Sequence, residues 1–266
     1  MESISMYGAY AAQSVKSQLE YRASALFQIV GQFLINIIEF TALWTLFDRF
    51  GNLNGWTLPE AAFCYGLVGT IFGAADFFSR GFDMAGNLIR TGEFDRFLLR
   101  PRSLVLQMFG YEVTLRRFGR MGQGLLILIW ALSQLQLDWT VGKILLLLYT
   151  IPCGMVFFIS LIIIQASLSV KSVQSLEFMN VLTYGGVQTA QYPLSVYTDF
   201  FRRFFTFVVP LGCVTYYPSL IILGKTDSLM DWIGFGWFSP VAGPFFFLLA
   251  LWLFRRSLRW YMSTGS

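Results

Sequence analysis

The sequence predicts an all-α polytopic membrane protein with six transmembrane helices. Charged residues make up 13 % of the 266 residues and apolar residues 56 %, whereas about 25 % of the residues of an ordinary soluble domain are charged. A bilayer core of roughly 30 Å requires about 20 mostly apolar residues per helix. Six such helices and their loops account for the whole length, so we expect residues 1–266 to form a single transmembrane domain.

Six apolar runs give the expected positions of the spans. They cover residues 23–47, 58–78, 118–137, 144–168, 204–223 and 237–254. Residues 1–22 precede the first run, and their apolar side chains recur at helical spacing, which predicts an interfacial amphipathic helix on the inner membrane surface. These side chains are Ile4, Tyr7, Ala11, Val15 and Leu19.

The basic residues give the expected orientation. With the amino terminus in the cytoplasm, 16 of the 19 Lys and Arg residues fall on the inside, and only Arg49, Lys143 and Lys225 remain outside. Cytoplasmic loops of membrane proteins carry such an excess of basic residues. The bias predicts an even number of spans with both termini in the cytoplasm, and it assigns Arg202 and Arg203 to the inside.

Two stretches do not fit a simple span pattern. Residues 171–199 are moderately apolar and contain Gly185, Gly186 and Pro193; they are consistent with a cytoplasmic or re-entrant helix pair, or with the start of a longer fifth span. Prolines from Pro210 to Pro244 predict irregular backbone. At membrane depth, irregular backbone must be buried in protein or line a cavity.

The first span carries four polar residues at spacings of 4, 4 and 3. At about 100° per residue they share a stripe roughly 80° wide. A charge at mid-membrane costs on the order of 3 kcal/mol or more, so this polar stripe should face protein or a water-filled path. It fits two roles, hydrogen bonding between helices and lining a substrate route. The four residues are Gln28, Gln32, Asn36 and Glu39.

The second span carries small residues every three or four positions, at Ala62, Gly66, Gly69 and Gly73. Small residues at this spacing allow the backbones of two transmembrane helices to approach closely. We therefore expect a neighbouring helix to pack on this face.

The longest basic inner segment covers residues 81–101. Thr91 is placed to cap a short helix that Pro101 stops. Phe94, Phe97 and Leu98 would share one face of that helix, which predicts an exposed aromatic surface that docks into a groove on another protein. The alternative is a loop that lies on the inner membrane surface. The candidate coupling residues are Arg90, Glu93, Phe94, Asp95, Arg96, Phe97, Leu98 and Arg100.

The residue types argue against catalysis and against metal binding by this chain. There is no histidine, and the three cysteines stand singly in apolar stretches, so neither a zinc site nor a disulfide framework is expected. No Gly-x4-Gly-Lys-Ser/Thr phosphate loop is present. We expect no nucleic-acid partner, because the basic residues report orientation and anionic lipid.

Three motifs resemble those of the bacterial ATP-binding-cassette (ABC) permeases of the type 2 exporter superfamily, in the six-span branch without a fused ATPase. The first is Leu-Ile-Arg-Thr-Gly-Glu-Phe-Asp-Arg-Phe-Leu-Leu-Arg-Pro at 88–101. The second is Tyr-Pro-Leu-Ser-Val-Tyr at 192–197, followed by Phe-Val-Val-Pro at 207–210 and Tyr-Tyr-Pro at 216–218. The third is Tyr-Met-Ser-Thr-Gly-Ser at 261–266. The resemblance covers essentially the whole chain.

This resemblance implies an elbow helix, six spans, a coupling helix between spans two and three, and short external re-entrant helices before the last span. It also implies a transport subunit that is not itself an enzyme, in the bacterial plasma (inner) membrane. Such permeases pair with themselves or a sister permease and bind two copies of a cytosolic ABC ATPase, which holds ATP and Mg²⁺. The implied function is export along the dimer interface; the alternative is an ion-gradient-driven secondary transporter or channel subunit, for which Glu39 is the clear mid-membrane ionisable group.

Overall fold

The computed structural model describes residues 22–112, 114–170, 175–227 and 234–261, together with Lys16, Gln18 and Glu20. These residues form helices and connecting turns without any β-strand, apart from one isolated bridge between Leu53 and Trp56. The all-α prediction is therefore confirmed for this part of the chain. The expected interfacial helix of residues 1–22 lies almost entirely outside the described residues.

Four helical stretches in the described part are long and apolar enough to cross a membrane. They are α2 (Arg22–Phe50), α3 (Leu58–Phe78), α9 (Val141–Ser169) and the stretch Phe235–Trp260, whose main helix is α15 (Ala242–Ser257). They coincide with the predicted first, second, fourth and sixth spans. α8 (Arg117–Gln134) occupies most of the predicted third span, and Arg117 and Arg120 in its first turns lower its mean hydropathy.

The prediction of a fifth span at residues 204–223 is wrong. The chain there is broken into α11 (Asp199–Arg203), a π-helical turn η2 (Phe204–Val208), α12 (Leu211–Val214) and α13 (Tyr216–Leu223). Pro210 has no amide hydrogen to continue a helix, and Val209 before it is extended. The segment is as apolar as a span requires, but Pro210 interrupts the helix that the apolar run predicted.

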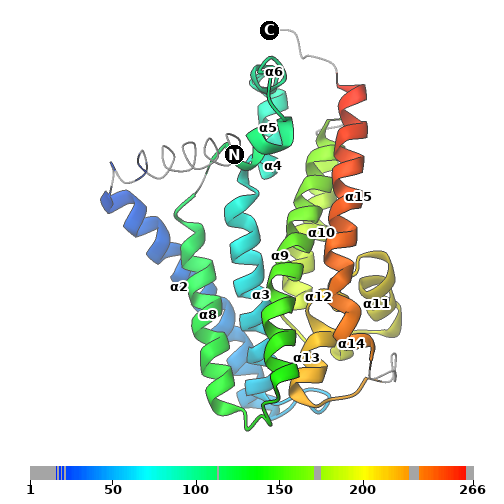
Figure 1. Cartoon of the computed structure of the whole chain (residues 1–266). Helices are drawn as coiled ribbons and strands as arrows, with labels where there is room; N and C mark the ends of the chain where they lie inside the picture. The colour runs from blue at the N-terminus through cyan, green and yellow to red at the C-terminus, as the bar shows by residue number, and fades with distance from the viewer. Residues whose placement is uncertain are drawn as a thin grey trace.

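α10 (Ser175–Ala190) runs back along α9 in place of that span (Figure 1). Gln165 of α9 donates to Asn180 over 3.1 Å and accepts from Thr183 over 3.1 Å. Beyond α10, a 3-10 turn η1 (Leu194–Val196) meets the loop between α2 and α3, where Trp56 Nε1 donates to Ser195 Oγ over 2.8 Å. In the described part of residues 171–199, a single 16-residue helix lies against α9 and is followed by η1, so neither a helix pair nor a helix continuing into residues 204–223 is present there.

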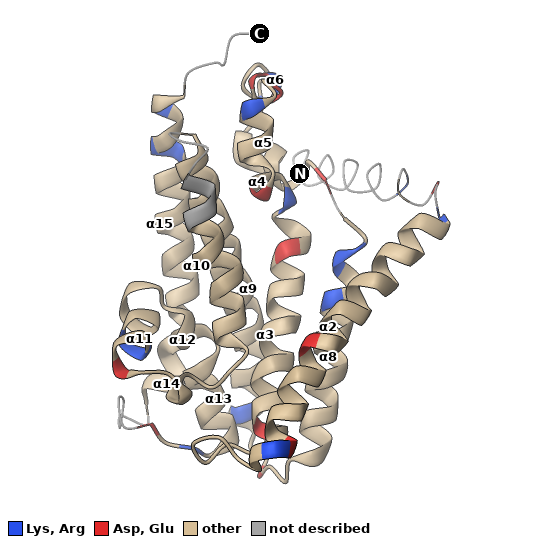
Figure 2. Ribbon diagram, turned by 180° about the vertical axis from the view of Figure 1, so that it is seen from behind, with Lys and Arg blue, Asp and Glu red and all other residues tan. Residues whose placement is uncertain are grey.

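Arg202 and Arg203 consequently lie at the end of the bundle that carries the α2–α3 loop. Arg202 forms a buried ion pair with Asp227, and Lys225 near it donates to Gly55 O over 2.6 Å. Their predicted placement on the same side as residues 81–101 is wrong, because the short helices that carry them do not cross the bundle. Figure 2 shows charged residues concentrated towards the two ends, with long uncharged stretches between.

α3 packs on α8 through the small residues that the sequence singled out. A Cβ on Gly66 would lie 2.5 Å from the backbone nitrogen of Leu128, and a Cβ on Gly124 would lie 2.5 Å from that of Thr70. Such distances leave no room for a side chain, so both helices depend on glycine at their crossing. The predicted close approach is confirmed, and α8 is the neighbouring helix.

Residues 80–109 form four short helices at one end of the bundle. They are α4 (Arg80–Asp83), α5 (Ala85–Arg90), α6 (Phe94–Leu98) and α7 (Leu104–Phe109). In Figure 1, α5 and α6 project from the end of α3 towards the carboxyl end of α15. Thr91 does not cap α6: its hydroxyl donates back to Asn87 O over 3.1 Å, and the chain turns at Gly92 with a φ of 74°.

Candidate functional site: a charge cluster beneath the projecting helices

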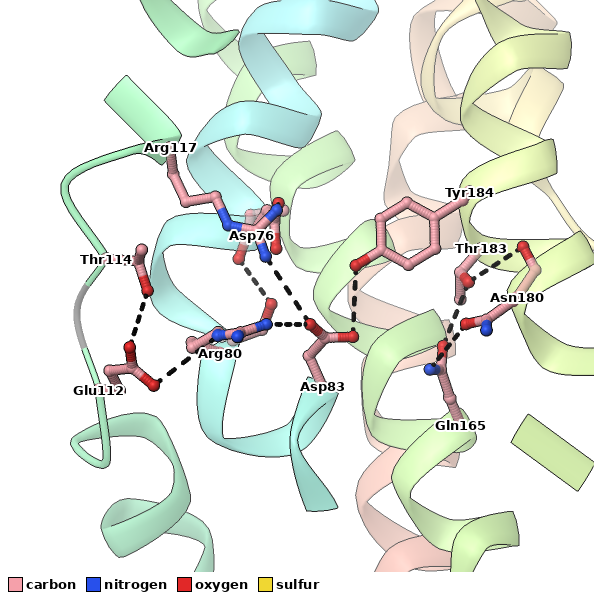
Figure 3. Close-up of polar contacts among 12 residues, drawn as sticks. Asp76, Arg80, Asp83, Glu112, Thr114, Arg117, Gln165, Asn180, Thr183 and Tyr184 are labelled. Atoms are coloured by element: carbon pink, nitrogen blue, oxygen red, sulfur yellow. Dashed lines mark hydrogen bonds and ion pairs between the residues drawn. The ribbon is translucent and has the colours of Figure 1, made fainter. Parts of the chain in front are cut away.

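Five charged side chains meet where α4–α7 join the long helices. Arg80 and Asp83 come from α4, Glu112 from the connection that follows α7, Asp76 from the last turns of α3, and Arg117 from the first residue of α8. Figure 3 shows them converging from these elements. We call these five residues the charge cluster.

The ion pairs of the charge cluster form a continuous chain. Arg117 pairs with Asp76 and also lies 3.7 Å from Asp83, measured from Nη2 to Oδ2. Arg80 Nη1 lies 2.7 Å from the same Asp83 oxygen, and Arg80 Nε lies 3.8 Å from Glu112 Oε2. One network thus connects α3, α4, α8 and the link after α7.

The Asp76–Arg117 pair is the buried part of this cluster. Asp76 is fully buried and Arg117 nearly so, and neither Asp76 Oδ1 nor Arg117 Nε has a hydrogen-bond partner among the described residues. Two ions removed from water need each other, since loss of one leaves an uncompensated buried charge. The pair therefore fixes the position of the start of α8 relative to the end of α3.

α10 joins the cluster through Tyr184, whose hydroxyl donates to Asp83 Oδ1 over 3.3 Å. The Tyr184 ring also packs edge-on against Phe72 of α3, at 5.7 Å between ring centroids. A displacement of α4 would consequently be felt by α3, α8 and α10 together.

The aromatic side chains of the projecting helices are buried, contrary to the predicted exposed surface. Phe94 is fully buried, with its ring centroid 5.2 Å from that of Tyr261, and Phe97 packs 5.5 Å from Tyr111. The phenylalanines face inward because the chain end and the link after α7 cover them. At the end of α6, the exposed apolar side chains are Leu98 and Leu99, at 44 % and 84 % relative exposure.

Most of the charged candidate residues are exposed on α5, α6 and the turns beside them. Arg90, Glu93, Arg96 and Arg100 are exposed, and Arg100 lies 5.7 Å from the centroid of the Phe97 ring. Asp95 is half-buried and accepts a hydrogen bond of 2.6 Å from the Tyr261 hydroxyl. Of the residues predicted for coupling, Phe94 and Phe97 are thus buried, Asp95 is half-buried, and the others are exposed.

Two tyrosines at this end have perturbed acidities. Partial burial, followed by the hydrogen bond and charge of Asp95, raises the pKa of Tyr261 to about 12. Partial burial also raises the pKa of Tyr111, to which the nearby carboxylates of Glu93 and Glu112 add. Both phenols therefore remain neutral throughout the physiological range, and Tyr261 stays a donor to Asp95.

The polar stripe of α2 is not brought together into one site. Gln28 is exposed and donates to Ser24 Oγ over 3.4 Å, whereas Asn36 is buried and donates to Gln32 O over 2.8 Å. Neighbouring helices reach α2 here at Asn36 O, which accepts from the Tyr65 hydroxyl over 3.1 Å and from Gln123 Nε2 over 3.4 Å. Glu39 has a buried Oε2 without a hydrogen-bond partner among the described residues.

The charge cluster was not predicted from the sequence. Its signal was present in opposite charges at the facing ends of consecutive spans, Asp76 near the end of one and Arg117 at the start of the next. Those positions are adjacent only because α3 and α8 pack as neighbours, and span assignment alone does not establish that packing.

A bundle of long apolar helices with a compact charged extension at one end is typical of a multi-pass membrane protein. The chain matches the family model described as ABC-2 family transporter protein over residues 33–265. It therefore belongs to this family and is an ABC type 2 permease. Neither the curated proteins nor the solved structures contain a match to the chain.

Proposed function

We propose that this chain is the membrane subunit of an ATP-driven exporter that receives its energy from a separate cytosolic ABC ATPase. The observation that carries the proposal is the exposed pair Leu98 and Leu99 at the tip of α6, held on a buried aromatic base. Exposed large apolar side chains ringed by charges are typical of protein interaction sites. α4–α7 then form the coupling segment at the cytoplasmic end.

The proposed arrangement has six crossings, formed by α2, α3, α8, α9, α10 and α15. α10 has 16 residues, which at 1.5 Å per residue is about 24 Å and somewhat short for a bilayer core of roughly 30 Å. Its passage along α9 to Ser195 supports a crossing. Residues 194–223 then form short external re-entrant helices, and both termini lie in the cytoplasm, in a multi-pass bacterial inner-membrane protein.

The charge cluster is the proposed route by which the ATPase moves the bundle. Closure of the ATPases upon nucleotide binding would displace α6, and α4 would pass the displacement to α3, α8 and α10 through Asp83. Rigid secondary elements joined by ion pairs carry such couplings. In this proposal the ATPase holds ATP and Mg²⁺, and this chain supplies the helices that move and form the substrate path.

Two permease chains, identical or sister chains, would complete the path together with two ATPase copies. α2 supports this arrangement, because only 11 % of the residues in its most apolar stretch are buried within the described chain. The substrate would move outward along the interface between the two permeases, with Gln28 on the exposed side of α2 and Gln32 and Glu39 half-buried beside it.

Replacing Leu98 and Leu99 together by serine tests the docking surface. Both are exposed, so the variant should insert and fold normally while losing co-purification with the ATPase and ATP-dependent export. Phe200→Ser is the matched control, since Phe200 is 77 % exposed on α11 at the opposite end. Unchanged ATPase binding in the double variant would refute the coupling role of the α6 tip.

A further inference from the structure

A groove between α9 and α15 lies at the same end of the bundle as the coupling segment. It has a volume of about 190 Å³ and is lined by eight residues, Ile164, Ser167, Leu168, Trp252, Leu253, Arg256, Ser257 and Trp260. Tyr261, which follows the last residue of the lining, contacts Phe94 and Asp95 and so joins this end of the chain to α6. None of its residues belongs to the charge cluster.

The groove exists because small side chains face each other across the two helices. Ser167 and Ser257 are both buried. Their hydroxyls donate within their own helices, to Ile163 O and Phe254 O, each over 2.8 Å. Because both hydroxyl hydrogens are already used in these bonds, the groove beside the serines suits an apolar part of a ligand, which needs no hydrogen-bond donor.

One wall of the groove is a row of amphipathic side chains. Trp252, Arg256 and Trp260 follow one another at intervals of four along α15 and the final 3-10 turn η4 (Leu258–Trp260), which places them on one face of the helix. Trp252 and Trp260 are 58 % and 62 % exposed, and Arg256 is exposed between them. Along this face, the Arg256 guanidinium therefore lies between the positions of the Trp252 and Trp260 indoles.

The charged residues in the last turns of α15 and in η4 are all basic. Arg255 and Arg259 flank Arg256, all three are exposed, and none of them forms an ion pair within the described residues. An exposed guanidinium binds a phosphate group bidentately. Tryptophans favour the level of the lipid headgroups, where basic pockets between helices bind anionic headgroups.

We propose that the α9–α15 groove binds an anionic phospholipid. Its phosphate would contact Arg256 between the indoles of Trp252 and Trp260, and the start of an acyl chain would lie along Ile164 and Leu253 in the groove. The charge of Arg256 selects the headgroup, and the serines leave the space for the chain. The site requires only that this end of the bundle lies at a membrane surface, and is independent of whether the ATPase docks at α6.

Native mass spectrometry of the intact chain released from nanodiscs tests the site. With phosphatidylglycerol nanodiscs, we expect a retained lipid whose occupancy falls on the order of tenfold in Arg256→Gln, the effect of losing a charge-assisted hydrogen bond. Arg255→Gln is the matched control, because Arg255 does not line the groove, and should retain the lipid. Phosphatidylcholine nanodiscs should give no retained lipid.

Three results would overturn the proposal. Equal loss in Arg255→Gln and Arg256→Gln would mean a diffuse surface charge, and equal retention of phosphatidylcholine would mean an apolar groove without headgroup selection. Cross-linking of cysteine-substituted Trp252 between two copies of the chain would mean that the groove is a permease interface. ATPase co-purification, measured on the same variants, should be unchanged in all of them, which separates this site from the coupling function.

Discussion

The hydroxyl of Tyr261 donates to Oδ1 of Asp95 over 2.6 Å and thereby ties the carboxyl end of α15 to the α6 helix. The Tyr261 ring also covers the buried Phe94. The two residues are 166 positions apart in the sequence, and we call their contact the clasp between α6 and the chain that follows α15.

Tyr261→Phe should loosen this clasp and keep the ring that covers Phe94. A hydrogen bond to a charged group contributes about 1.5–3 kcal/mol, reduced here because the tyrosine is partly exposed. We expect faster amide hydrogen exchange in α6 and weaker ATPase binding, without a loss of insertion. Tyr149→Phe in α9 removes a hydroxyl from a half-exposed tyrosine far from α6 and is the control; equal exchange in the two variants would contradict the role of the clasp.

Arg117→Met should destabilise the protein strongly. It leaves the fully buried Asp76 without its partner, and breaking a buried ion pair in this way costs about 3–5 kcal/mol. Thermal unfolding in detergent should show a large fall in Tm, whereas Arg96→Gln, which removes an exposed arginine, should leave the Tm nearly unchanged.

The double variant Asp76→Asn with Arg117→Met separates charge from packing. Because it removes both buried charges, much of the lost Tm should return. Coupling should not return, since Asp83 then loses one of its two arginines. A double variant with wild-type export would show that the charge cluster serves stability alone.

Gly124→Ala and Gly122→Ala test the packing of α3 on α8 with the same substitution on one helix. A Cβ on Gly124 would meet the backbone of Thr70 and Gly69, while a Cβ on Gly122 meets nothing within 4 Å. We expect Gly124→Ala to lower the Tm, because backbone atoms have to move. Gly122→Ala should raise the stability by roughly 0.5–1 kcal/mol, the helix preference of alanine over glycine. The same Tm change in both would argue against the close crossing.

The sequence was sufficient for the features that depend on local composition. Four of the predicted spans and the glycine face of α3 follow from apolar runs and small-residue spacing, and the structure has them where the residues predicted. The fifth span failed because one proline outweighed an apolar run, and the placement of Arg202 failed with it. Pro210 and Arg202 are both plain in the sequence, but the path of the chain around them is set by tertiary packing.

The candidate site was less predictable, because it is made of contacts between distant segments. Phe94 and Phe97 have the pattern of an exposed docking face, yet Tyr261 and Tyr111 cover them. No local sequence pattern predicts that Tyr261 packs against Phe94. The charge cluster is likewise visible only once α3, α4 and α8 are placed together, which is why Leu99 and Arg117 were absent from the predicted site.

Glu39→Gln addresses the open role of the polar stripe. Glu39 Oε2 is buried and has no hydrogen-bond partner among the described residues, so removal of its charge should leave the Tm unchanged or raise it. If the stripe lines the substrate path, export of a panel of candidate substrates by the reconstituted complex should change in rate or range. Asp48→Asn is the matched control, since Asp48 is exposed near the other end of the same helix. A Glu39→Gln variant that loses stability and keeps wild-type export per folded molecule would assign the stripe to helix packing.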